Sequence, residues 1–223
     1  QELGSVANNS DWHQVVIAWL TVACLGISTV LTLVASVLTP DANMVASTIS
    51  DVAAGPHDWV QDLGFYLLAF ALLALAYGMW KIPTSAWHWR GAIFTMPIMS
   101  IAVAVMGFYQ EYGDGDSNRD GIVIHIYLVY AFGIAFLSLL LLSIPTLASR
   151  HRWWKPLNIG FFVGWTALAV YYFSMSTGWD GIVERIIALA YAGWLFLFAW
   201  RLAMEGGSET GQQAAEATGT APD

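Results

Sequence analysis

The chain is poor in charged residues. Asp, Glu, Lys and Arg make up 11% of its 223 residues, and only 8 residues are Lys or Arg. A soluble domain carries about 25% charged residues, so this composition excludes a domain that folds in water. The chain also has a single cysteine, Cys24, which excludes an intramolecular disulfide.

Ionisable side chains are missing from long parts of the hydrophobic segments. Residues 64–79, 128–144 and 186–200 contain no Asp, Glu, Lys, Arg or His. Ion and proton pathways use such side chains, so we do not expect a proton-coupled transporter, and no inverted repeat is visible. We also expect no haem, because the histidines lie at the edges of the hydrophobic segments or in loops.

Apolar residues, in contrast, are abundant. They make up 57% of the chain, and six stretches reach the roughly 20 residues that cross a bilayer. These stretches are 14–38, 59–80, 91–109, 122–144, 157–176 and 182–204. The sequence therefore predicts an all-α, polytopic integral membrane bundle of six transmembrane helices over residues 14–204. We expect residues 1–13 to be an N-terminal cytoplasmic segment and residues 205–223, which lack apolar periodicity, to be a disordered cytoplasmic tail.

Basic residues predict how the bundle is oriented. Six of the 8 fall on one side of the predicted spans: Lys81, Arg90, Arg150, Arg152, Lys155 and Arg201. The positive-inside rule assigns that side to the cytoplasm, so both termini are expected there, in a multi-pass protein of the cell membrane. Tryptophans at predicted helix ends are expected to anchor in the headgroup layer: Trp12, Trp59, Trp80, Trp87, Trp89, Trp153, Trp154, Trp179 and Trp200.

The opposite side is acidic. It carries Asp41, Asp51, Asp58, Asp62, Glu111, Asp114, Asp116, Asp120, Asp180 and Glu184, with few basic residues. One interpretation is a salt-adapted surface that solvates itself with carboxylates. That interpretation explains less well the acids that fall inside helical turns.

Several polar residues on this side could converge. Asp58, Asp62 and Tyr66 share one helix face by their spacing, and Glu184 and Arg185 are adjacent in the last span. His125 opens the fourth span, and residues 43–56 could form a short interfacial helix bearing Ser50 and Asp51. Because ionisable residues in a membrane segment normally face the bundle interior, we predict an extracytoplasmic polar cup. Its members are Ser50, Asp51, Asp62, Tyr66, His125, Glu184 and Arg185; the alternative is an acid–Arg pair that only ties helices together.

The loop before the fourth span resembles the start of a calcium loop. Residues 116–121 fit the pattern D-x-[DN]-x-[DN]-G, with Gly121 at the sharp turn. The candidate ligands are Asp114, Asp116, Asn118 and Asp120. Tyr127 stands where the pattern needs a closing Glu, so an ordinary Asp/Asn/Gly turn is the alternative. Zinc is a weaker candidate, because it usually takes three protein ligands and no H-x-x-x-H pair exists on any span.

Short motifs resemble a known family. They are Ile49-Ser50-Asp51, Leu63-Gly64-Phe65, His125, and Gly181 to Arg185 leading into Trp194. Together they resemble the prokaryotic six-helix membrane family catalogued as domain of unknown function 998, over about residues 14–204. The resemblance implies a six-helix bundle and a site using Ser50, Asp51, His125 and Arg185, with no known activity.

Two functions from different classes follow. The first is a membrane protein that binds a lipid, a small ligand or a partner protein through its cup, with the calcium loop beside it. The second is an intramembrane metal-dependent lipid hydrolase that uses an Asp/His/Ser site near the outer face. We favour binding, because His57, His125 and an Asp are the most that the chain offers a metal near this face. The expected partners are membrane lipids or another membrane protein, and no nucleic acid.

Overall fold

The chain folds into helices throughout the part that the structure describes. This computed structural model describes all residues except 1–3, 41, 54, 109–118, 176–177 and 219–223, with backbone alone for residues 4–12, 119–123 and 205–218. The helices are α1 (Gly4–Leu38), α2 (Ile49–Ala53), α3 (Asp58–Trp80), α4 (Trp87–Phe108), α5 (Arg119–Arg150), α6 (Trp154–Ser174) and α7 (Asp180–Thr218). All but α2 are long and apolar enough to cross a membrane, which confirms the predicted all-α bundle with six spans.

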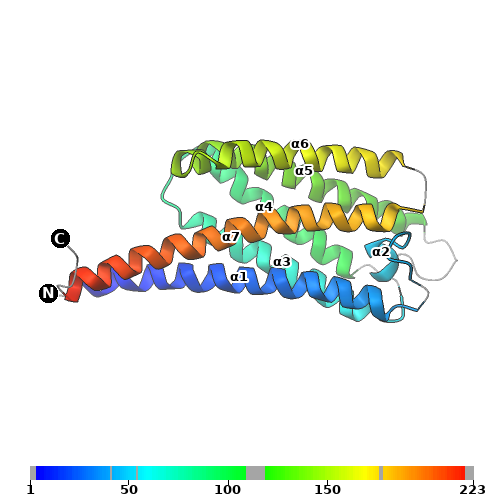
Figure 1. Ribbon diagram of the computed structural model, residues 1–223, viewed down its shortest axis with the longest axis horizontal. Helices are drawn as coiled ribbons and strands as arrows, with labels where there is room; N and C mark the ends of the chain where they lie inside the picture. The colour runs from blue at the N-terminus through cyan, green and yellow to red at the C-terminus, as the bar shows by residue number, and fades with distance from the viewer. Residues whose placement is uncertain (1–3, 41, 54, 109–118, 176–177, 219–223) are drawn as a thin grey trace.

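The six long helices form a closed ring. Each packs against the next in the order α1, α3, α4, α5, α6, α7, and α7 returns to α1. Short α2 packs against α1, α3 and α7 at one end of the bundle, named here the α2 end (Figure 1). The helices α1 and α7 run side by side beyond the others at the opposite end, the terminal end, where both chain termini lie (Figure 1).

Polar side chains tie neighbouring helices of the ring. The Ser28 hydroxyl of α1 donates to the Gly64 carbonyl of α3 at 2.7 Å, and Ser100 of α4 donates to the Ala69 carbonyl of α3 at 2.8 Å. Asn158 of α6 is fully buried and joins three helices: it donates to the Leu140 carbonyl at 3.0 Å and accepts from the Trp194 indole at 2.9 Å. Such bonds hold helices together inside a bilayer, where apolar contact alone gives little preference for a partner.

The terminal half of the bundle is filled by large side chains. Trp89, Trp154, Trp194 and Phe198 are all at most 2% exposed, and the rings of Trp154 and Trp194 lie 6.2 Å apart. The expectation that Trp89 and Trp154 anchor in the headgroup layer is therefore wrong. Their places near helix ends suggested anchors, but the rotation of α4 and α6 turns both rings inward. Trp59, Trp80, Trp87 and Trp179 are more than 60% exposed, as anchors should be.

Two predicted boundaries differ from the observed helices. The helix α7 continues to Thr218, whereas we expected a disordered tail from residue 205. Alanine, glutamate and glutamine make up 8 of residues 205–218 and favour a helix even without an apolar face, although three glycines there oppose it. The helix α5 begins at Arg119, so Gly121 lies in its first turn instead of in a sharp loop turn.

Candidate functional site

The bundle is hollow at the α2 end. A cavity of about 390 Å3, named here the main cavity, is lined by side chains from every helix except α1. This volume is within the range of small-molecule sites, which are usually apolar with a few convergent polar groups. The cavity begins where the buried aromatic side chains of the terminal half end.

Charged and hydrogen-bonding side chains gather at one end of the main cavity, whereas aromatic side chains line both ends, since Tyr172 and Phe173 lie in the last turn of α6. Ser50, Asp51, His125, Asp180 and Glu184 line it near the α2 end and are named here the polar rim. Phe132, Trp165 and Tyr191 also line it and are named here the aromatic floor. Phe132 and Tyr191 each follow a rim residue of the same helix by seven positions, so the floor lies about 10 Å deeper along the helix axes.

The aromatic floor is closely packed against α5. The ring of Tyr191 lies 5.0 Å from that of Phe132, and the ring of Trp165 lies 5.6 Å from that of Phe136. A Cβ added at Gly133 would lie 2.9 Å from the Trp165 ring, so glycine is what lets this ring approach α5. Trp165 is 9% exposed, and its indole N–H has no hydrogen-bond partner among the described residues. A buried donor left unpaired costs about 1–3 kcal/mol.

The first turn of α2 is held by three hydrogen bonds. The Asp51 carboxylate accepts from the Thr48 N–H at 2.7 Å, and the Thr48 hydroxyl accepts from the Asp51 N–H at 3.0 Å. This reciprocal arrangement is a capping box. The Glu184 carboxylate of α7 accepts from the Ile49 N–H at 2.5 Å. The backbone that carries Ser50 is thus fixed by its own cap and by a neighbouring helix.

Ser50 and His125 meet at the polar rim. The Ser50 Oγ lies 2.8 Å from the His125 Nε2, although the two residues are 75 positions apart. His125 is 9% exposed, and both side chains line the main cavity. The sequence placed both residues in one polar cup, and in the structure they are hydrogen-bonded neighbours.

Arg185 anchors the chain before α2. Its Nη1 donates to the carbonyls of Ser47 at 2.7 Å, Gly181 at 2.9 Å and Met44 at 3.2 Å, and its Nη2 donates to the Ser36 hydroxyl at 2.8 Å. Within the described chain no carboxylate is hydrogen-bonded to this guanidinium. Arg185 therefore fixes the loop over residues 44–47 to α7 and α1 through backbone and hydroxyl partners, while Glu184 and Asp51 attract it electrostatically.

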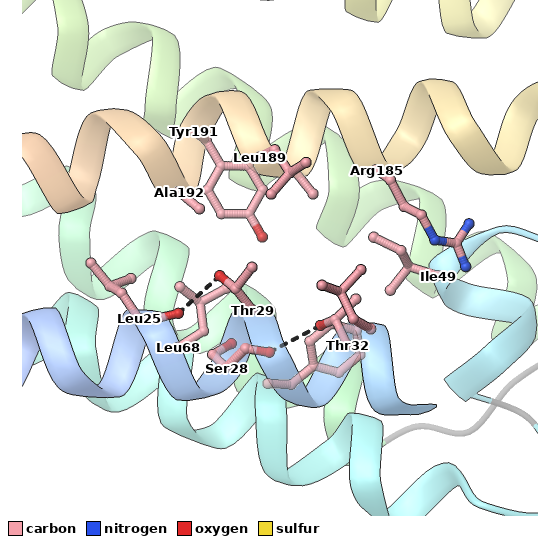
Figure 2. Close-up of a pocket in the computed structure, with 13 residues that line it drawn as sticks. Leu25, Ser28, Thr29, Thr32, Ile49, Leu68, Arg185, Leu189, Tyr191 and Ala192 are labelled. Carbon is pink, nitrogen blue, oxygen red and sulfur yellow. Dashed lines mark hydrogen bonds between the residues drawn. The ribbon is translucent and has the colours of Figure 1, made fainter. Parts of the chain in front are cut away.

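A smaller cavity adjoins the main one. It measures about 60 Å3 and lies between α1, α3 and α7, with Tyr191 lining both cavities. Figure 2 shows the Tyr191 hydroxyl directed from α7 toward α1 and α3, with Arg185 further along α7. The Thr29 and Thr32 side chains also line the smaller cavity, and their hydroxyls donate to carbonyls of their own helix, α1, at 2.9 and 3.2 Å. Its size and hydroxyl lining suit one or two water molecules.

The predicted cup is only partly assembled. Ser50, Asp51, His125 and Glu184 line the main cavity, and Arg185 lines the smaller one. Asp62 and Tyr66 line neither; the Tyr66 hydroxyl instead donates to the Gly107 carbonyl at 3.1 Å and ties α3 to α4. Helical spacing predicted that these two residues share one face of α3. Spacing does not determine which neighbouring helix that face packs against.

The candidate metal ligands fall mostly outside the described residues. This is the case for Asp114, Asp116 and Asn118, and for the side chain of Asp120, so the calcium loop stays a prediction. Elsewhere in the described chain, no group of three or more His, Cys, Asp or Glu side chains could hold a metal.

Sequence reasoning missed some residues of the site. Thr48 caps α2, and the spacing T-x-x-D before an apolar run is a signal that could have identified it. The apolar lining from α6, with Trp165, Ala169 and Phe173, carries no comparable signal, because such residues are ordinary in any membrane helix.

A family model described as "Protein of unknown function (DUF998)" matches residues 22–201. The chain belongs to this family. The match includes all of the polar rim and the aromatic floor, so the main cavity lies within the part shared with the family. No curated protein and no solved structure matches the chain. The protein is thus a multi-pass membrane protein of the DUF998 family.

Proposed function

We propose that this protein binds an amphiphile in the main cavity, with the polar head at the rim and the apolar chain toward the aromatic floor. The observation that carries the proposal is a cavity of about 390 Å3 whose polar lining is gathered at one end. An amphiphile likewise has a polar end and an apolar end. Its head needs hydrogen bonds, and its chain gains free energy from apolar contact.

The charges at the polar rim determine which ligand head groups can bind. Asp51, Asp180 and Glu184 line the main cavity, whereas no Lys or Arg does so among the described residues. A buried anion beside the carboxylates of Asp51 and Asp180 would be repelled, while an ammonium or hydroxyl group finds acceptors there. The ligand we propose therefore has a cationic or hydroxyl-bearing head, as a long-chain amine or amino alcohol has.

The orientation of the bundle determines the side of the membrane from which the ligand would enter. Basic residues gather at the terminal end, so the positive-inside rule supports a rim that faces the extracytoplasmic side of the cell membrane. The ligand would then enter from that side or from the membrane. A calcium ion held by Asp114, Asp116, Asn118 and Asp120 would lie on the same side, and it remains a separate proposal.

Paired probes with opposite head charge test the function. Dodecylamine should raise the melting temperature of the protein in lipid nanodiscs, and dodecanoic acid should not. A ligand at about 100 times its Kd adds about 2.7 kcal/mol of stability, which is several degrees for a chain of this size.

Variants on one helix provide the controls. Ala169 lines the main cavity and Ala167 is an exposed residue on the same helix. Ala169→Phe fills the cavity and should abolish the dodecylamine response, whereas Ala167→Phe should keep it. Equal responses of the two variants would show that the amine acts elsewhere, and an equal effect of the acid would contradict the charge argument.

A further inference from the structure

The contact between Ser50 and His125 has a chemistry that binding alone does not need. A serine hydroxyl within 2.8 Å of an imidazole Nε2 is the arrangement that activates a serine nucleophile. In the tautomer with its proton on Nδ1, His125 accepts the Ser50 hydroxyl proton at Nε2. Both residues line the main cavity, where an amphiphile would place the junction between its head and its chain.

The surroundings hold Ser50 in place. The capping box of Thr48 and Asp51 and the bond from the Ile49 N–H to Glu184 fix the backbone on both sides of Ser50. The side chain of His125 is held in α5 at 9% exposure, which leaves its ring little freedom. A nucleophile and base fixed this way lose little entropy when a substrate arrives.

We propose that Ser50 and His125 form a nucleophile–base pair that hydrolyses an acyl ester of the amphiphile in the main cavity. The Ser50 Oγ forms a bond to the acyl carbon while its proton moves to His125 Nε2. The ester C–O bond breaks, and the leaving alcohol takes that proton from His125. Water then attacks the acyl–Ser50 carbon and gives a proton to His125, which returns it to the Ser50 Oγ as the carboxylic acid leaves. One ester and one water are consumed, and one alcohol and one acid are formed.

The rim favours acyl transfer over phosphoryl transfer. A phosphate ester would bring negative charge beside Asp51, Asp180 and Glu184, with no Lys or Arg among the described residues that line the main cavity. A carboxylic ester is uncharged at the reacting group and carries no such penalty. The inference rests on the proposed function, since the cavity must first hold the amphiphile.

Covalent labelling of the full chain is the direct test. The wild-type protein in nanodiscs is treated with an uncharged alkyl fluorophosphonate, which reacts with activated serines, and its adducts are located by mass spectrometry. The expected result is an adduct on Ser50, and His125→Ala should slow its formation by about 100-fold or more, as is typical when a general base is lost. His57→Ala is the matched control, because His57 lies near the same end and lines neither cavity.

Other outcomes would overturn the inference. A folded wild-type protein with no adduct on Ser50, or one labelled equally fast after His125→Ala, would show that the contact only ties α2 to α5. Ser174→Ala, at an exposed serine of α6, should label like the wild type, whereas Ser50→Ala should lose the adduct. Measuring the melting-temperature response to dodecylamine on the same wild-type samples separates the two proposals. A response without an adduct on Ser50 overturns the inference alone, and the absence of both overturns the proposed function as well.

Discussion

At the scale of single residues, Arg185 shows how a charge is accommodated in this bundle. Arg185 is 8% exposed; its two Nη atoms donate to three carbonyls and one hydroxyl, whereas its Nε has no hydrogen-bond partner among the described residues. An ionisable residue in a membrane segment usually faces the interior with partners, and the sequence predicted as much. The identity of those partners could not be predicted, because the positions of carbonyl groups depend on the path of the loop before α2.

Removal of Arg185 should destabilise the protein strongly. Arg185→Ala leaves the Met44 and Ser47 carbonyls without their donor and should cost about 3 kcal/mol or more. Arg185→Lys should recover only part of this loss, since one ammonium cannot follow the fork of the guanidinium. Thermal melting in detergent measures both variants. Arg152→Ala, at an exposed arginine, is the control, and an equal melting temperature for Arg185→Ala and Arg152→Ala would mean that Arg185 is merely solvated.

At the scale of elements, the start of α7 and the loop before α2 form one unit. The Ile182 N–H donates to the Val45 carbonyl at 3.1 Å, and Arg185 bonds the same loop. This close approach requires glycine at position 181, because an added Cβ would overlap the backbone of Ser47. The unit positions α2, and through α2 it positions Ser50.

Gly181→Ala should therefore separate the loop from α7. The clash is with backbone and cannot be relieved by a side-chain rotation, so we expect a loss of about 2–3 kcal/mol, as for other overpacked sites. Gly193→Ala on the same helix is the control, because nothing lies within 4 Å of its added Cβ. That change should leave stability equal or raise it by up to about 1 kcal/mol. Melting temperatures that fall equally in both variants would argue against a tight contact at Gly181.

Element boundaries and element packing were predictable to different degrees. The six spans follow from apolar length alone, because a bilayer demands long helices with every backbone group paired. The order of helices around the ring does not follow from length, and neither does the burial of Trp89 and Trp154. Both depend on the rotation of each helix about its axis, and a helix that is apolar all round gives no sequence signal for that rotation.

At the scale of the whole molecule, the two halves of the bundle differ. The terminal half is filled by tryptophan and phenylalanine, whereas the α2 end keeps a cavity with a polar rim. The sequence predicted where polar residues gather, since acids and His125 recur on one side. It could not predict the cavity, because empty space depends on how well side chains from six helices fit together.

Orientation of the whole bundle can be tested by labelling. Asn43 lies near α2 and Arg152 near the start of α6, and both are exposed. Cysteines at these positions in a Cys24→Ser background should react from opposite sides, with Asn43→Cys accessible to an impermeant maleimide on intact cells. Labelling of Arg152→Cys but not Asn43→Cys on intact cells would reverse the orientation, and labelling of both would contradict the six-span topology.

Occupation of the main cavity by an amphiphile can be tested most directly by photo-crosslinking. The probe is dodecylamine carrying a diazirine near the far end of its alkyl chain, activated by light in nanodiscs. Adducts are expected on Phe132 and Trp165 of the aromatic floor, and plain dodecylamine should suppress them. Adducts confined to lipid-facing residues such as Ile134 and Val163, which are 67% and 60% exposed, and unaffected by competition would contradict occupation of the main cavity.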